Sequence, residues 1–291
     1  RFAELTAPRD LAKMFEGVEY TPWRAFRDTE DARYVALTLP RVLARVPYRR
    51  ADKRVPGFVF EEDVDAPDGS GYLWMTAAWG YAAVAVAAYS RCGWFMKTRG
   101  VEGGGRVEGL PEYAFPTDAT DPAVRRPTEV TLTDRRDYEL SDLGFLPLVP
   151  AKVHGLAVFM GAQSVQRPKQ YFDPAASANA DLSTKFNYML SVSRFAHYVK
   201  VIARDKTGSG MEADELQRLL HEWLHGYVVG NPASVSDEVK ARKPLAAAEV
   251  RVQPVAGKPG WYEAVTHLRP HYQMETATTT LRLTAEIPKK V

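Results

Sequence analysis

The chain has one cysteine, Cys92, in 291 residues, so it cannot form an internal disulfide. Structural disulfides belong to oxidising compartments, and small secreted proteins usually carry several. Cys92 stands next to the apolar residues Trp94 and Phe95, a setting typical of an ordinary buried thiol. We therefore expect a protein of a reducing compartment, the cytosol.

A surplus of positive charge is also missing. Lys and Arg total 38 and Asp and Glu total 36, which leaves a net charge of +2. A general nucleic-acid-binding protein carries a large basic excess, so this class is disfavoured. The stretch Arg41–Arg54 is locally basic and aromatic and could contact an acidic partner or nucleic acid. We expect it to be a solvated helix face and loop instead.

No charged and then apolar leader opens the chain, which begins at Arg1 without a methionine. We expect a C-terminal portion of a longer chain. The uncharged stretch 72–90 approaches the length of a membrane span, but alanine dominates it. Membrane insertion depends mainly on Leu, Ile, Phe and Val, so the composition favours a buried helix and no membrane insertion.

A nucleotide-binding loop is missing as well. The glycine cluster Gly100–Gly105 is followed by Arg106 and Val107, where a Walker-type loop would have Lys and then Ser or Thr. Glu102 and Glu108 would repel phosphate. We expect a tight turn that uses positive φ angles. Any mechanical work must then draw on something other than nucleotide hydrolysis by this chain.

The apolar pattern predicts a mixed α/β fold with two domains, residues 1–172 and 173–291. The first domain has short apolar runs typical of buried strands, and the second has helical periodicity followed by alternating strand patterns. The expected elements are strands at 129–133, 144–149 and 156–159, one helix from 173 to about 207, a helix at 211–229, and strands near 250–253, 261–268 and 279–287.

One stretch matches a zinc-hydrolase motif. His221, Glu222 and His225 form H-E-x-x-H on a predicted helix, where two histidines four residues apart share a face. The longer pattern fails, and a third ligand would have to be Glu238 or Glu249, in an irregular stretch and a strand. A zinc-dependent metallohydrolase remains the alternative. We expect an amphipathic helix with incidental histidines, no enzyme, no cofactor and no metal.

Several stretches, in order along nearly the whole chain, resemble one family. It is the large subunit of the type VI secretion contractile sheath, the TssC/VipB family, here its C-terminal portion. The stretches that carry the resemblance are Phe26–Asp28, Glu30–Pro40, Arg99–Gly105, Phe115–Asp118, Thr133–Arg136, Glu139–Phe145, Gly161–Ser164, Ser193–Tyr198, Pro259–Gly260 and Leu268–His271.

The resemblance implies a tail-sheath-like fold, with long helices packed on a mixed sheet and antiparallel strands at the C-terminus. It also implies a structural role in a bacterial cytoplasm. The expected partners are the small sheath subunit (TssB/VipA-like), neighbouring copies of this chain, an Hcp-like inner tube, the baseplate and an AAA+ unfoldase. The unfoldase would bind an N-terminal part that precedes these residues.

Two sets of residues are candidate contacts in such an assembly. An edge strand has unpaired backbone N–H and C=O groups that can pair with another strand. The resemblance implies that neighbouring subunits supply this strand. The helix at 211–229 would face the inner tube. The inter-subunit strand candidates are Val250, Val252, Leu281, Leu283 and Ile287, and the inner-tube candidates are Glu212, Asp214, Glu215 and Arg218.

Overall fold

The structure is a computed structural model that divides into two compact units. The first contains residues 1–87 and 98–166, and the second contains 88–97 and 167–291. The sequence predicted one domain boundary, between residues 172 and 173. In the structure, residues 88–97 also belong to the second unit. The residues described are 6–7, 10–49, 57, 60–64, 69, 71–115, 123–206, 211–257, 261–271 and 281–287.

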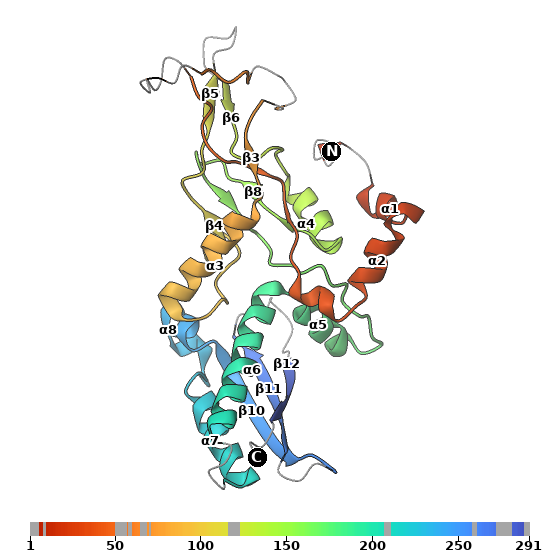
Figure 1. The fold of residues 1–291 in the computed structure, drawn as a ribbon, viewed down its shortest axis with the longest axis vertical. Coiled ribbons are helices and arrows are strands. Elements are labelled where there is room, and N and C mark those ends of the chain that lie inside the picture. Colours follow the sequence, from red (N-terminus) through yellow and green to blue (C-terminus); the bar gives the residue numbers. More distant parts are fainter. Residues whose placement is uncertain are drawn as a thin grey trace. The chain divides into compact units, whose positions relative to one another are not determined.

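Helices occur in both units (Figure 1). Their bounds are α1 Leu11–Phe15, α2 Thr21–Arg27, α3 Ala78–Cys92, α4 Asp134–Asp142, α5 Pro174–Ser183, α6 Phe186–Lys206, α7 Ala213–His225 and α8 Asp237–Arg242.

Strands of the first unit are short, and those of the second are long. Their bounds are β1 Thr38–Leu39, β2 Val42–Leu43, β3 Trp74–Met75, β4 Arg106–Val107, β5 Tyr113–Phe115, β6 Ala123–Arg125, β7 Leu146–Pro147, β8 Val149–Pro150, β9 Ala157–Val158, β10 Leu245–Pro254, β11 Tyr262–Pro270 and β12 Leu281–Ile287.

The mixed α/β class is confirmed. In the described part of the first unit β1 pairs parallel with β7, and the other strand pairs are antiparallel. The second unit holds one antiparallel sheet in the order β10-β11-β12. The antiparallel C-terminal strands expected from the sequence are therefore present.

The predicted strand at 129–133 is wrong. Thr133 instead begins α4 as its N-cap, because its hydroxyl accepts a hydrogen bond from the Arg136 backbone N–H. A side-chain cap of this kind satisfies a donor that the first turn of a helix leaves open, which favours helix over strand. Leu140 of α4 is then fully buried in the core of the first unit beside Leu39 and Leu132.

The alanine-rich stretch forms α3, which begins at Ala78 and has one buried and one exposed side. Tyr81 and Val84 face the interior, whereas Trp79 and Val86 are exposed. Within the described ranges, no helix is both long and apolar enough to cross a membrane.

The single long helix predicted from 173 is also wrong, because the chain breaks it into α5 and α6. At Thr184 both the backbone N–H and the hydroxyl donate to the carbonyl of Asp181, at 3.0 and 2.6 Å. A hydroxyl that bonds back to the preceding turn competes with the helical ladder. No Pro or Gly marks this break, so the sequence held no strong signal for it.

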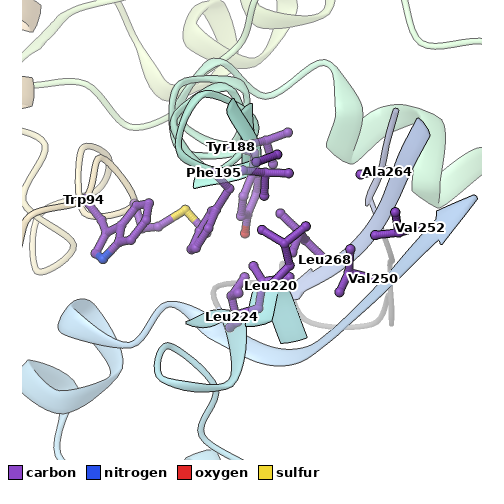
Figure 2. Packing of buried hydrophobic residues seen from close by; sticks show 14 of the residues in the cluster. Trp94, Tyr188, Phe195, Leu220, Leu224, Val250, Val252, Ala264 and Leu268 are labelled. Carbon is purple, nitrogen blue, oxygen red and sulfur yellow. The ribbon is translucent and has the colours of Figure 1, made fainter. Parts of the chain in front are cut away.

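The core of the second unit lies between α6, α7 and the sheet. α7 packs against β10 and α6 against β12. Figure 2 shows Phe195 and Tyr188 of α6 meeting Leu220 and Leu224 of α7, with Trp94 at one side. Burying each large apolar side chain of this kind stabilises the fold by roughly 1.5–3 kcal/mol.

Candidate assembly surfaces of the second unit

Helix α7 carries most of the predicted site residues, and its sequence explains which face is buried. Leu216, Leu220 and Leu224 recur every four residues and are buried, so they form the stripe that packs on the core. His221 and His225 stand one position further along the helix, and both are exposed. The apolar stripe therefore holds the histidines on rigid helix and turns them outward.

The two histidines lie close together. Their ring centroids are 4.1 Å apart, with the ring planes inclined by 42°. Glu222 is exposed beside them. Among the described residues, no group of three or more His, Cys, Asp or Glu side chains is placed to hold a metal ion. The third ligand that a hydrolytic zinc centre needs is therefore not found in the described part, and the hydrolase alternative gains no support from the geometry.

The acidic residues predicted to face the inner tube lie at the start of α7. Glu212 is the N-cap residue and Asp214 and Glu215 are in the first turn, all exposed. The partial positive charge at a helix N-terminus favours carboxylates there. Arg218 is exposed one turn later and, with Gln217, His221 and Glu222, lines a hollow of about 270 Å³.

Val250 and Val252, predicted to serve inter-subunit strands, lie on β10 with their side chains in the core of this same unit. They are register partners of Thr266 and Ala264, which are also buried. Their side chains are thus packed in the core of their own chain. Any contact of β10 with a neighbouring subunit would have to use the β10 backbone.

The backbone edge of β10 is partly covered from within the chain. The Val252 N–H donates to the side-chain oxygen of Gln217 on α7, at 2.9 Å. At the start of the strand, the Leu245 N–H donates to Tyr227 and its carbonyl accepts from Val229, at 3.1 and 2.8 Å. Sequence reasoning missed Gln217, because no local pattern marks a side chain that caps a distant strand.

At the opposite edge, β12 pairs with β11, with Leu281, Leu283 and Ile287 in register with Leu268, Thr266 and Tyr262. In antiparallel strands, successive residues point their N–H groups to opposite sides. Because the Val252 N–H points away from β11, the register places the Ala264 and Ala285 groups between β11 and β12. The backbone groups of Thr284 therefore face the outer side of β12.

The glycine cluster is a structural turn. Gly100 and Gly104 have φ angles of 71° and 89°, which favour glycine. The Gly100 N–H donates to the Phe159 carbonyl, and the Phe159 N–H donates to Gly105, at 2.8 and 2.9 Å. The turn expected from the sequence is confirmed. The Gly100 amide thus binds another part of the chain, and the Gly105 amide donates to the Gly100 carbonyl at 2.9 Å, so neither amide is directed at a phosphate.

Two arginines of the basic stretch Arg41–Arg54 form ion pairs within the chain. Arg41 makes two hydrogen bonds with the Glu129 carboxylate, at 2.8 and 2.7 Å, and Arg45 makes two with Glu62, both 2.7 Å. The Arg45 guanidinium lowers the pKa of Glu62. These two arginines are neutralised within the chain. Residues 50–54 of the stretch lie outside the described part.

Comparison with known proteins matches two parts of the chain to models of one protein family. The model of the EvpB/VC_A0108 tail sheath N-terminal domain (VipB) matches residues 1–166. The model of the EvpB/VC_A0108 tail sheath gpW/gp25-like domain (VipB_2) matches residues 175–287. The second match contains α7 and the whole three-stranded sheet.

Individual proteins are also similar to the chain. The type VI secretion system sheath protein TssC1 of Pseudomonas aeruginosa PAO1 is 47% identical over 285 residues, which cover 98% of this chain and 57% of that protein. The crystal structure of a sheath tail protein from Desulfitobacterium hafniense has 13% identity and a TM-score of 0.38, covering 97% of this chain and 55% of its own. This chain thus spans little more than half the length of these relatives. From the two family matches and the 47% identity to TssC1, the chain belongs to the VipB family of tail sheath proteins.

Proposed function

We propose that this chain is a structural subunit of a type VI secretion contractile sheath and acts by assembly, without catalysis. Its membership of the VipB tail sheath family supports the assignment, as does its similarity to a protein named as a type VI secretion system sheath protein. The observation that carries the mechanism is the place of β12 at the edge of the three-stranded sheet in the described part of the chain, where backbone groups can pair with a strand from another molecule.

The proposed partners at this level are the small sheath subunit and further copies of the chain. Strand addition across subunits uses main-chain hydrogen bonds for its affinity, so it can link neighbouring subunits through their backbones. A lattice linked in this way can be built extended and can contract as other interfaces grow. The energy for propelling an inner tube would then be stored in the extended lattice.

The strand-addition site is better placed on β12 than on β10. On β10, Gln217 and the segment through Tyr227 and Val229 already bind outward-facing backbone groups. On β12, the register turns the Thr284 N–H away from β11. β12, which contains Leu281, Leu283 and Ile287, therefore remains the candidate inter-subunit strand. The backbone groups of these three residues face β11, as those of Ala285 do, so the outward groups are those of Arg282, Thr284 and Glu286. Val250 and Val252 act mainly as core residues of their own chain.

Replacing Thr284 by proline tests this edge. Proline removes an N–H and is tolerated on edge strands where that N–H faces outward, so the β11–β12 ladder should survive. Co-expressed with the small sheath subunit, Thr284→Pro should give soluble complexes without tubes by negative-stain microscopy. Thr284→Val, which keeps the N–H, is the matched control and should form tubes.

A chain ending at Thr276, which lacks β12, should fail in the same way. Normal tubes from both Thr284→Pro and the truncated chain would overturn the linking role. A collapse of the circular dichroism spectrum in Thr284→Pro alone would show that the outward direction of its N–H is wrong.

The inner-tube contact is proposed for the first turns of α7. Glu212, Asp214, Glu215 and Arg218 offer exposed charges on a helix whose other face is held by the core. Reversing the three acids to lysine should reduce co-sedimentation of an Hcp-like tube with the sheath. Reversal of the exposed Asp237 and Glu238 on α8 is the control. Equal loss in both variants would contradict a contact at α7.

Finer roles follow from the family alone. A baseplate and an AAA+ unfoldase would act on the assembled sheath in a bacterial cytoplasm. None of the residues described above is assigned to either partner. We propose that the unfoldase binds a part of the longer relatives that this 291-residue chain does not cover, so pull-down of the unfoldase by this chain is expected to fail.

A further inference from the structure

The exposed histidine pair on α7 is spaced so that both rings can reach one ion. His221 and His225 are separated by one helical turn, and their ring centroids lie 4.1 Å apart. Side chains four residues apart on a helix are neighbours on its surface. A small rotation of the two rings can bring one nitrogen of each within the roughly 2.0–2.1 Å bond lengths typical of zinc–histidine coordination to a shared ion.

The pair is held in place before any ion arrives. Leu220 and Leu224, which precede the two histidines, are both fully buried in the core of the second unit. The turn of helix between the histidines is therefore fixed by packing on the adjacent face. A ligand pair on rigid helix loses little conformational freedom on binding, which raises affinity.

The surrounding charges are compatible with a cation. His225 is in the last turn of α7, where the partial negative charge of the helix C-terminus favours positive charge. Glu222 adds a carboxylate next to His221, and Arg218 adds an opposing positive charge one turn earlier. These two side chains roughly offset each other, which leaves the helix terminus as a net favourable contribution.

We propose that His221 and His225 form a two-histidine site for a divalent late transition-metal ion, such as Zn²⁺, Ni²⁺ or Cu²⁺. Imidazole suits these ions, and affinity should follow the order in which Cu²⁺ binds most tightly. The remaining coordination positions are left to water. Among the described residues the pair has no third protein ligand, so the site is a surface chelate and not a hydrolytic centre, and it does not depend on the proposed sheath function.

The test uses the untagged 291-residue chain, because a polyhistidine tag would bind the same ions. Isothermal titration with Zn²⁺ alone and with Cu²⁺ alone should show a site that is lost in the exposed-surface variants His221→Gln and His225→Gln. Loss of an outer-shell partner commonly costs 10–100-fold in affinity, so losing a direct ligand should weaken binding by at least about tenfold. Electron paramagnetic resonance of the Cu²⁺ form should show two coordinated nitrogens.

Three further variants separate a chelate from nonspecific binding. His197→Gln removes an exposed helical histidine of α6 that has Ser193 and Val201 at the four-residue spacings, and should leave affinity unchanged. Glu222→Gln should change it by less than about threefold, by analogy with a weak outer contact. The double variant His225→Gln with Gly226→His keeps the histidine count but moves the second ring off the face, and should bind as weakly as His225→Gln alone.

The metal should also stabilise the folded chain, because the pair is assembled only in the helix. A rise in Tm with Zn²⁺ that disappears in His221→Gln would support the site. Unchanged affinity in both single histidine variants would overturn the proposal. So would full binding in the register-shifted double variant, or a loss in Glu222→Gln as large as in the histidine variants.

Discussion

The indole of Trp94 stacks on the ring of Phe195, with ring centroids 4.0 Å apart and planes inclined by 16°. Trp94 follows α3, whereas Phe195 is in the middle of α6. The residue before Phe195, Arg194, donates a hydrogen bond to the Tyr89 hydroxyl at 2.9 Å and lies over the Tyr89 ring. These contacts explain why residues 88–97 belong to the second unit and not to the half of the chain that contains them.

Replacing Trp94 by alanine should therefore destabilise the second unit. Trp94 is only 4% exposed, and truncating a buried aromatic side chain to alanine typically costs about 3–5 kcal/mol. The measurement is the shift of the urea unfolding midpoint. Trp79→Ala is the matched control, because that side chain is 68% exposed and its loss should change stability by less than about 0.5 kcal/mol. Equal effects would contradict the packing.

Gly105 should not tolerate a side chain. A Cβ at this position would come within 2.4 Å of the Phe159 carbonyl oxygen and 2.7 Å of the Arg99 Cα. Both contacts are to backbone, so Gly105→Ala must displace the turn, at a cost of about 1–3 kcal/mol or more. Thermal unfolding would measure the loss. Gly161→Ala meets only the Ser141 hydroxyl, at 3.7 Å, and should be nearly neutral.

Asp137 of α4 should make stability fall as pH rises through 6. Burial, and then the charge of Asp134, raise the pKa of Asp137 from 3.8 to about 6, and one carboxylate oxygen has no hydrogen-bond partner among the described residues. The folded chain thus holds this proton more tightly than the unfolded chain. The resulting stabilisation is complete below about pH 4 and is lost on titration through about pH 6.

Asp137→Asn should accordingly stabilise the chain at pH 8 by about 1 kcal/mol, a value already reduced for solvent screening. The gain should shrink toward zero near pH 4. Urea unfolding of both proteins at several pH values provides the measurement. Asp134→Asn should give a smaller gain, since that exposed residue acts only through its charge. A gain independent of pH would contradict the burial argument.

Gln217 should protect the edge of β10. Its side-chain oxygen accepts the Val252 N–H at 2.9 Å. Gln217→Ala removes this acceptor and should cost about 1 kcal/mol. Hydrogen exchange at the Val252 amide should speed up by roughly fivefold, as that free energy implies. Gln217→Glu keeps an acceptor and is the control, while an unchanged Val252 rate in the alanine variant would rule out the contact.

Local patterns in the sequence were sufficient for several features. The four-residue spacing of Leu216, Leu220 and Leu224 predicts the buried face of α7. The alternation through Leu281 and Ile287 predicts a strand, which is β12. These predictions succeeded because helix and strand periods are properties of neighbouring residues and need no knowledge of distant partners. The family resemblance also rested on sequence alone.

Other predictions failed where two structures compete for the same residues. At Thr133 the sequence favours a strand, but the Thr133 hydroxyl caps the N-terminus of α4. At Thr184 the composition favours a continuous helix, but the Thr184 hydroxyl and N–H both donate to the Asp181 carbonyl, where α5 ends. In each case a single side-chain hydrogen bond decided the outcome, and threonine is compatible with either choice.

The sequence by itself determined the fold class, the family and the residue types available on α7 and the last strands. Only the tertiary structure decided that Val252 is a core residue whose N–H binds Gln217, that Trp94 belongs with Phe195, and that His221 and His225 face outward together. The reason is physical. The direction of a backbone donor and the burial of a side chain depend on which distant element packs beside it, and one strand's own residues do not specify that neighbour.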